Sequence, residues 1–328
     1  MSADPGTLEV PSVDMQASLG GVPLVSPVLT ASGCSAFGQE LDPFFDLTAI
    51  GAVVTKSVQL RARSGRPTPR MAETPSGMLN SIGLQGPGID GLLAEELPWL
   101  AARGARALVS IAGSRTEDFA ELASRLRGVP GVLGLEVNIS CPNVESRGEV
   151  FACNPDASAE VVAAVRAAAD PAHPVYAKLT PDVTDIVSVA RACADAGANG
   201  LSMINTLLGL AIDPDTMRPV LGGVTGGLSG PAIRPVALRC VWQVHQALPN
   251  VPILGMGGIR TGLDALQFVL AGAGAVSVGT AVFNDPSAPV RIAEELAAAL
   301  GERGFGRLSD AVGYAHRRAD PPAGRHSR

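Results

Sequence analysis

Eight short apolar runs recur along the chain, separated by segments with helical spacing. Each run is almost continuously apolar rather than alternating, which is the pattern of a strand buried on both faces of a parallel sheet. Eight such units in series predict an α/β fold, a (β/α)₈ TIM barrel with inserted loops at its C-terminal face. The runs are Pro23–Thr30, Gly51–Thr55, Ala107–Ile111, Gly134–Ile139, Val175–Leu179, Gly200–Ile204, Pro252–Gly255 and Ala275–Val278.

Apolar residues at helical spacing predict helices between many of these strands. Thr184 is expected to cap one helix, and Gly197 and Gly272 fall where helices should end. The predicted helices are Ala157–Ala169, Thr184–Ala196, Pro231–Leu248, Leu263–Ala271 and Pro289–Leu300.

We expect one barrel domain over residues 15–316, with mobile tails at residues 1–14 and 317–328. Three connections are too long to be plain turns, namely Ser57–Gly88, Pro142–Pro155 and Leu207–Gly230. All three follow predicted strands, on the face where barrels build their active sites. Long loops within a compact domain are usually functional.

Composition narrows the class of protein. An apolar content of 46% with 17% charged residues is ample for a large core. A net charge of −6 gives no support for nucleic-acid binding. No apolar run is long enough to cross a bilayer and no secretion signal is visible, so we expect a cytoplasmic protein. The five cysteines are odd in number and form no Cys-x-x-Cys, which argues against disulfides, zinc or an iron–sulfur cluster in this chain.

Polar residues stand at the C-terminal ends of the predicted strands. A single lysine there is most often a solvated strand end, but two lysines and two asparagines on one rim indicate a site. Glycine-rich turns after the seventh and eighth strands let backbone N–H groups approach a phosphate. The series runs Ser32, Lys56, Ser110, Asn138 with Cys141, Lys178, Asn205 with Thr206, Gly257 with Gly258, and Gly279 with Thr280.

The side-chain types suggest what the rest of the ligand needs. A lysine at the rim can stabilise negative charge on a reduced flavin or bind a substrate carboxylate. Asparagines both donate and accept hydrogen bonds, which suits a planar ring with alternating C=O and N–H groups. The candidate asparagines for this role are Asn80, Asn138, Asn143 and Asn205. None of this names the ligand.

One hexapeptide, Asn138-Ile139-Ser140-Cys141-Pro142-Asn143, resembles the active-site turn of class 1 dihydroorotate dehydrogenases, in which cysteine is the catalytic base. Further segments from about Val22 to Leu300 are similar to the same family, in the same order. With its Cys141-Pro142-Asn143-Val144 and Met203-Ile204-Asn205-Thr206 segments, the chain looks more like class 1B than class 1A, and it is most similar to the class 1B catalytic (FMN) subunit. The further segments are Thr68-Pro69-Arg70, Glu73–Asn80, Met203–Leu207, Thr225–Gly230 and Gly255–Ile259.

The resemblance implies a role for each matching residue. Cys141 is the expected general base. The expected FMN-binding residues are Ser32, Lys56, Ser57, Ser110, Asn138, Lys178, Ile204, Gly230, Gly257, Gly258, Gly279 and Thr280. The expected substrate-binding residues are Lys56, Asn80, Ser81, Ile82, Gly83, Leu84, Asn138, Asn205 and Thr206. Ser110 and Gly86 depart from the family pattern, because asparagine is common at both positions.

The resemblance also implies partners. FMN is expected in this chain, whereas FAD and a [2Fe–2S] cluster are expected only in a partner subunit that passes electrons to NAD⁺. A homodimer, and a heterotetramer with that partner, are the expected assemblies. The sequence leaves the electron acceptor open between NAD⁺ and fumarate.

Two other functions compete with dihydroorotate oxidation. A flavoprotein resembling the barrel domain of dihydropyrimidine dehydrogenase would act on uracil or thymine and need no carboxylate contact. A non-catalytic binding barrel is the second alternative, but it would not need Lys56, Asn80, Cys141, Lys178 and Asn205 together.

Overall fold

A parallel eight-stranded sheet forms the centre of the computed structural model, which describes residues 12–140 and 151–317. The strand order is β3-β16-β15-β10-β9-β8-β7-β4. The sheet closes because the Gly51 N–H donates to the Val28 carbonyl at 2.8 Å, joining its two ends. The predicted TIM barrel is therefore confirmed. Its strands are β3 (Val28–Thr30), β4 (Val53–Val54), β7 (Ala107–Ile111), β8 (Val132–Val137), β9 (Val175–Leu179), β10 (Gly200–Met203), β15 (Ile253–Met256) and β16 (Ala275–Val278).

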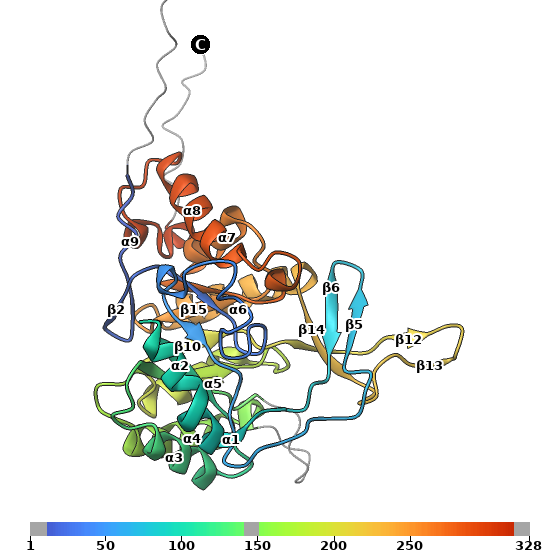
Figure 1. Ribbon diagram of the computed structural model, residues 1–328. Helices are drawn as coiled ribbons and strands as arrows, with labels where there is room; N and C mark the ends of the chain where they lie inside the picture. The colour runs from blue at the N-terminus through green and yellow to red at the C-terminus, as the bar shows by residue number, and fades with distance from the viewer. Residues whose placement is uncertain (1–11, 141–150, 318–328) are drawn as a thin grey trace, which may run out of the picture.

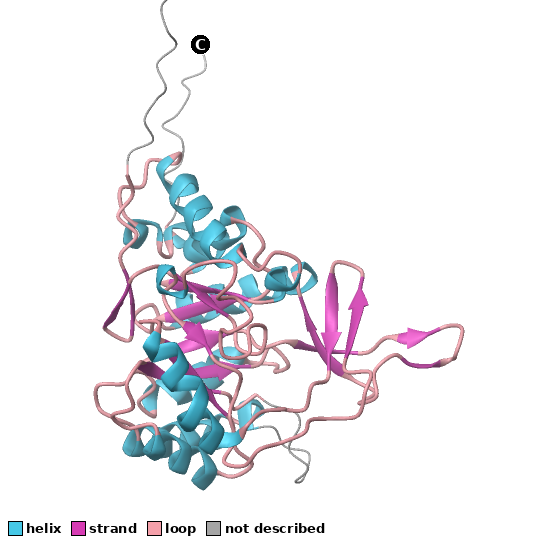
Figure 2. Cartoon of the chain, viewed as in Figure 1, coloured by secondary structure: helices cyan, strands magenta, loops and turns pink. Residues whose placement is uncertain are grey.

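Helices surround the sheet (Figures 1 and 2). The longer ones follow their strands in barrel order, and all five predicted helices are present. The helices of the outer layer are α1 (Gly88–Gly91), η2 (Leu92–Glu96), α2 (Leu97–Ala102), α3 (Thr116–Arg125), α4 (Pro155–Ala168), α5 (Ile186–Asp195), α6 (Arg234–Ala247), α7 (Gly262–Ala271) and α8 (Ala288–Gly301). Short helical turns complete the chain at η1 (Leu47–Ala49), η3 (Phe151–Cys153), η4 (Pro231–Ile233), η5 (Thr280–Phe283), α9 (Leu308–Ala311) and η6 (Tyr314–His316).

The core has two layers. A large cluster lies between the strands and the helices, whereas a smaller one, with Leu108, Tyr176 and Leu254, fills the inside of the barrel. The hairpin of β1 (Ala17–Leu19) and β2 (Val22–Leu24) adds its leucines to this inner cluster. The Gly20 N–H in its turn donates to the Tyr176 hydroxyl at 3.0 Å. The hairpin thus covers one end of the barrel.

Two sequence-based predictions about local structure were wrong. The first apolar run, Pro23–Thr30, does not form one strand: it divides into β2 and β3, because Pro27 has no N–H for a ladder and the Ser26 hydroxyl accepts from the Val28 N–H at 3.2 Å. The cap of α5 is Asp185 rather than Thr184, since its carboxylate accepts from the N–H groups of the following turn. Gly272 does end α7, with φ of 121°.

The two described long connections fold together into a second sheet. Its order is β11-β14-β6-β5, with antiparallel pairs throughout. Figure 1 shows it standing beside the barrel. A further hairpin, here called the arm (residues 210–220), extends beyond it. The strands are β5 (Met71–Thr74), β6 (Gly77–Asn80), β11 (Leu207–Gly209) and β14 (Gly226–Ser229), and in the arm β12 (Ile212–Asp213) and β13 (Arg218–Pro219).

Near the chain ends, the Asp14 N–H donates to the Gly306 carbonyl at 3.0 Å, and the Asp14 carbonyl accepts from the Leu308 N–H at 2.9 Å. The division into one domain and two tails stays a prediction. No helix in the described part of the chain is long and apolar enough to cross a membrane.

Candidate active site

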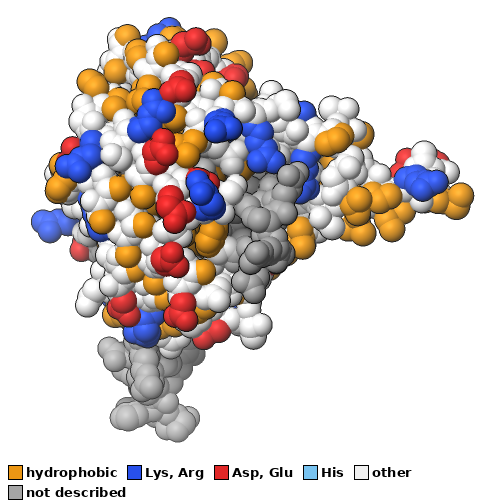
Figure 3. Space-filling view, turned by 90° about the horizontal axis from the view of Figure 1, so that it is seen from below, with side chains coloured by type: hydrophobic (Ala, Val, Ile, Leu, Met, Phe, Trp, Pro, Cys, Tyr) orange, Lys and Arg blue, Asp and Glu red, His pale blue; other side chains and the backbone are white. Residues whose placement is uncertain are grey.

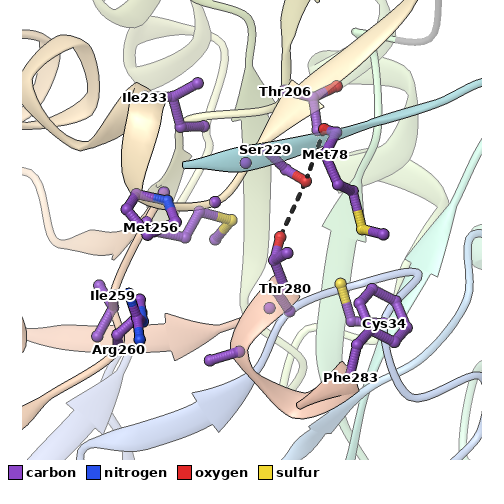
Figure 4. Close-up of a pocket in the computed structure, with 18 of the residues that line it drawn as sticks. Cys34, Met78, Thr206, Ser229, Ile233, Met256, Ile259, Arg260, Thr280 and Phe283 are labelled. Atoms are coloured by element: carbon purple, nitrogen blue, oxygen red, sulfur yellow. Dashed lines mark hydrogen bonds between the residues drawn. The ribbon is translucent and has the colours of Figure 1, made fainter. Parts of the chain in front are cut away.

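Two adjoining cavities open between the strand ends of the barrel and the second sheet. One, the glycine cavity, has a volume of about 490 Å³ and is lined by Gly230, Gly257, Gly258 and Gly279 (Figure 4). The other, the asparagine cavity, has a volume of about 440 Å³ and is lined by Asn80, Asn138 and Asn205. They share the lining residues Ser32, Cys34, Met78, Lys178, Asn205, Thr206, Ser229 and Phe283.

The glycine cavity has a wall that only glycine can build. Gly257 and Gly258 have φ of 126° and 80°. A Cβ at Gly258 would lie 2.7 Å from the Gly230 carbonyl oxygen. Outside helices and strands, the described backbone contains no hydrogen bond donated by Gly257, Gly258 or Gly279. Backbone N–H groups with close access and no backbone partner suit an anion such as a phosphate.

Side-chain hydroxyls complete this cavity. The Thr280 hydroxyl donates to the Ser229 hydroxyl at 2.9 Å, joining the end of β16 to β14 (Figure 4). The buried Ser277 hydroxyl lines the same cavity and has no hydrogen-bond partner among the described residues. A buried polar atom of this kind is expected to be satisfied by water or a ligand.

A buried ion pair stands at the junction of the two cavities. Lys178 Nζ lies 3.1 Å from Glu136 Oε1, and their side chains are 5% and 0% exposed. Both residues are on neighbouring parallel strands, β9 and β8. The second carboxylate oxygen of Glu136 has no hydrogen-bond partner in the described chain. The pair thus holds the positively charged Lys178 side chain at the junction, where it lines both cavities.

A chain of hydrogen bonds joins five strand ends. The Ser57 hydroxyl lies 2.8 Å from the Ser110 hydroxyl and 3.3 Å from that of Ser32. Asn138 donates its amide to Ser57 at 2.9 Å. Asn205 donates in turn to the Asn138 amide oxygen at 3.3 Å. These contacts orient the side chains that would face a ligand.

The second sheet supplies the outer wall of the asparagine cavity. Asn80 at the end of β6 donates to the Gly227 carbonyl of β14 at 3.2 Å. A Cβ at Gly227 would overlap the Thr206 hydroxyl oxygen, so glycine is needed for this approach. The Thr206 N–H donates to the Asn205 side chain at 2.8 Å. Two connections that are far apart in sequence thus bring Asn80, Asn205 and Thr206 together.

Most of the predicted site residues line one or both cavities. Ser110 does not: it is fully buried and bonds to Ser57, so its side chain supports a lining residue. Cys141, the predicted base, lies outside the described residues. Gly86 keeps its backbone bonds to Arg63 and would leave open space around a Cβ, so its departure from the family pattern does not disturb this loop. The predicted lining residues are Ser32, Lys56, Ser57, Asn80, Ser81, Ile82, Gly83, Leu84, Asn138, Lys178, Ile204, Asn205, Thr206, Gly230, Gly257, Gly258, Gly279 and Thr280.

Several residues of the site carry no clear functional signal in the sequence. Cys34 lines both cavities, and burial raises the pKa of its thiol to about 11, although Lys178 and Lys56 lower it. It is therefore a neutral thiol near pH 7. Glu136 lies inside an apolar strand and Arg66 lies in a loop, and neither position marks the charged side chain as part of a site. Each is recognised only by what it contacts in three dimensions.

Comparison with known proteins decides the family. A family model described as dihydroorotate dehydrogenase matches residues 15–300. The chain belongs to the dihydroorotate dehydrogenase family. It is 54% identical over 300 residues to the "dihydroorotate dehydrogenase B (NAD(+)), catalytic subunit" of Pelobacter propionicus, covering 92% of this chain and 98% of that one. The proteins of the same name from Desulforudis audaxviator and Anoxybacillus flavithermus are 51% and 50% identical, covering 92% and 90% of this chain and 97% and 94% of theirs.

The site of this family member fits the flavin nucleotide that the resemblance implies. The glycine cavity offers unpaired backbone N–H groups for a phosphate, and Ser277 offers an unpartnered hydroxyl within the described chain. Lys178 offers a buried positive charge where the two cavities meet. A planar ring placed at that junction would touch residues of both cavities.

Proposed function

We propose that this chain oxidises (S)-dihydroorotate to orotate, a step of de novo pyrimidine (UMP) biosynthesis, with FMN as its cofactor. The observation that carries the proposal is the junction of the two cavities at Lys178, Asn205 and Thr206. A flavin in the glycine cavity and a pyrimidine in the asparagine cavity would share these residues, as hydride transfer between stacked rings requires.

FMN would be held by two groups of residues. Gly230, Gly257, Gly258, Gly279 and Thr280 would receive its phosphate. Ser32, Lys56, Ser57, Asn138, Lys178 and Ile204 would line its ring system, with Ser110 acting through Ser57. When bound, FMN supplies the hydride acceptor. The Lys178 ammonium group favours negative charge near this ring, and Glu136 keeps that ammonium group in place.

The substrate would be oriented by the asparagine cavity. The amides of Asn80, Asn138 and Asn205 and the Thr206 hydroxyl match the alternating C=O and N–H groups of the dihydropyrimidine ring. Lys56 and the backbone from Ser81 to Leu84 line the same cavity and complete the predicted contacts.

The reaction removes a proton from C5 and a hydride from C6 of the substrate. The proton is weakly acidic and needs a positioned base. We assign that base to Cys141, whose thiolate would accept the proton and form a thiol. Asn138 and Ser140, just before it, are buried, and the Ser140 hydroxyl donates to the Lys178 carbonyl. These contacts hold the described chain in place up to Ser140, the residue before Cys141.

The reoxidation partner is also proposed. The names of the relatives, NAD(+)-linked catalytic subunits, support a second subunit, and we assign FAD and the [2Fe–2S] cluster to it. We propose a homodimer of this chain that binds two such partners as a heterotetramer in the cytoplasm, with NAD⁺ rather than fumarate as final acceptor.

The first test offers two substrates to the purified flavoprotein under anaerobic conditions. Dihydroorotate should bleach the flavin absorbance within seconds, and dihydrouracil should leave it unchanged. Bleaching by dihydrouracil alone would support the alternative dihydropyrimidine function. A protein that binds no flavin would support the non-catalytic barrel.

The second test replaces the proposed base. Cys141→Ala should slow flavin reduction by dihydroorotate by at least about 100-fold, the usual contribution of a general base, while flavin content is retained. Cys240→Ala on α6 is the matched control, because Cys240 is buried among core residues and lines neither cavity. Near-normal turnover in Cys141→Ala would overturn this assignment.

A further inference from the structure

A third positive side chain besides Lys56 and Lys178, that of Arg66, lines the asparagine cavity and is used by none of the contacts assigned above. It belongs to the long connection after β4. Its guanidinium donates to the Ser81 hydroxyl at 3.1 Å, and Ser81 is buried in the wall of the same cavity. This is the only polar contact of the Arg66 guanidinium within residues 12–140 and 151–317.

The backbone around Arg66 is held firmly, so the side chain has a defined direction. The Arg66 N–H donates to the Ile82 carbonyl at 3.0 Å, and its carbonyl accepts from the Arg70 guanidinium. The Ser81 N–H donates to the Arg70 carbonyl at 2.7 Å. Gly83 and Gly223 leave room for the side chain, since a Cβ at Gly223 would lie 2.9 Å from Arg66 Nη1.

The charge of Arg66 has no counter-ion among the described residues. Asp182 is a carboxylate that lines the same cavity, but its oxygens accept from the Leu208 N–H at 3.1 and 3.2 Å and from the Thr180 hydroxyl at 3.3 Å. A guanidinium has five N–H donors in a fixed planar fork, which matches a carboxylate in two parallel hydrogen bonds. Arg66 uses one donor in its bond to Ser81.

We infer that Arg66 is a specificity residue that recognises the carboxylate of the substrate and so separates dihydroorotate from uncharged dihydropyrimidines. The inference rests on the proposed function and deepens it. The amides of Asn80, Asn138 and Asn205 serve the ring, which both substrate classes share. The carboxylate is the group that the two classes do not share, and a positively charged guanidinium beside these amides can distinguish it.

Binding of orotate and of orotamide to the flavin-loaded protein tests this inference. Orotamide replaces the carboxylate by a neutral carboxamide of the same shape. Dissociation constants are measured by calorimetry and by the change in flavin absorbance. Arg66→Gln should weaken the binding of orotate about 10- to 100-fold, the range of a charge-assisted contact, and the binding of orotamide by less than about 2-fold. The dissociation constant of orotate for Arg66→Lys should lie between those for the wild type and for Arg66→Gln.

The control is Arg61→Gln. Arg61 lies in the same connection but is exposed and lines neither cavity, so its removal lowers the net charge equally and should leave both ligands unaffected. Equal weakening of orotate and orotamide by Arg66→Gln would show that Arg66 only orders the wall through Ser81, and unchanged orotate binding would also overturn the inference. A wild-type protein that binds flavin but neither orotate nor dihydroorotate would overturn the proposed function, and the inference with it.

Discussion

At the scale of single residues, the site was predictable where chemistry and position coincide. Lys178 and Asn205 stand at the ends of apolar strands, where a polar side chain has no structural advantage, and Gly258 lies in a glycine-rich turn after a strand. All three line a cavity. Glu136 and Arg66 could not be found in this way. Glu136 is fully buried inside a strand, and its partner lies on the neighbouring strand, 42 residues further along the chain. Such contacts depend on strand register, which apolar patterning does not reveal.

The Glu136–Lys178 pair leads to a prediction about stability and flavin binding. Glu136→Ala would leave the Lys178 charge buried without its partner, and should lower the free energy of unfolding by roughly 3–5 kcal/mol. Replacing both residues, as Glu136→Leu with Lys178→Met, removes both charges and should restore most of that stability. Urea unfolding of the flavin-free proteins measures the effect.

The double variant also separates folding from function. It should fold yet bind FMN more weakly than wild type, because the charge that faces the ring is gone. Flavin binding is followed by quenching of FMN fluorescence. A double variant with wild-type flavin affinity, or a stable Glu136→Ala protein, would contradict this account of the pair.

At the scale of elements, apolar patterning located the barrel strands and missed the second sheet. The strands β7, β9 and β16 were predicted with their observed bounds, because continuous apolar runs are diagnostic of strands covered on both faces. The strands β11 and β14 contain Gly209, Gly226 and Gly227 and are only partly buried, so nothing in their composition marks them as strands. They form because β6, from the other long connection, pairs with β14.

Gly227 tests whether this second sheet positions the substrate residues. Gly227→Ala should raise the KM for dihydroorotate or lower kcat by about 10- to 100-fold, because the added methyl group forces Thr206 away from β14 and misplaces its contacts. The Thr206 Cβ would lie 2.7 Å from the new atom, so a change of rotamer alone cannot relieve the clash. Flavin content should not change. Steady-state kinetics with absorbance-determined flavin occupancy is the measurement.

The matched control for this change is Gly86→Ala. Gly86 lies in the other long connection, after β4, and has no positive φ, and a methyl group added to it would meet no atom within 4 Å. It should keep wild-type kinetics. If both alanine variants behave alike, the close approach of Gly227 to Thr206 has no part in substrate binding.

At the scale of the whole molecule, the barrel is self-contained and the arm is not. The arm contains two strands of two residues each, β12 and β13, and a hairpin of this size is at best marginally stable alone in water. Figure 3 shows hydrophobic side chains gathered along it, with charged ones towards its tip. Ile212 and Met217 are 61% and 80% exposed, and Leu208 and Leu210 beside them are also exposed. The sequence predicted a long connection over Leu207–Gly230 but not that part of it would stand away from the barrel.

These observations lead to a prediction about assembly. We expect the arm to pack against a second copy of the chain in the proposed homodimer, because a two-fold interface would cover the same apolar side chains on both copies. Ile212→Asp with Met217→Asp should then convert the dimer to a monomer at micromolar concentration, since each copy would bring two charges into the contact. Light scattering after size exclusion measures the mass in solution.

An exposed leucine on the outside of the barrel provides the control for the arm variant. Leu263 at the start of α7 is 52% exposed, and Leu263→Asp makes a similar change on the outside of the barrel. It should leave the dimer intact. Flavin reduction by dihydroorotate should survive in the monomeric arm variant, because neither substituted residue lines a cavity. A double variant that stays dimeric would place the contact between copies elsewhere, and a monomer without flavin would mean that the arm supports the site itself.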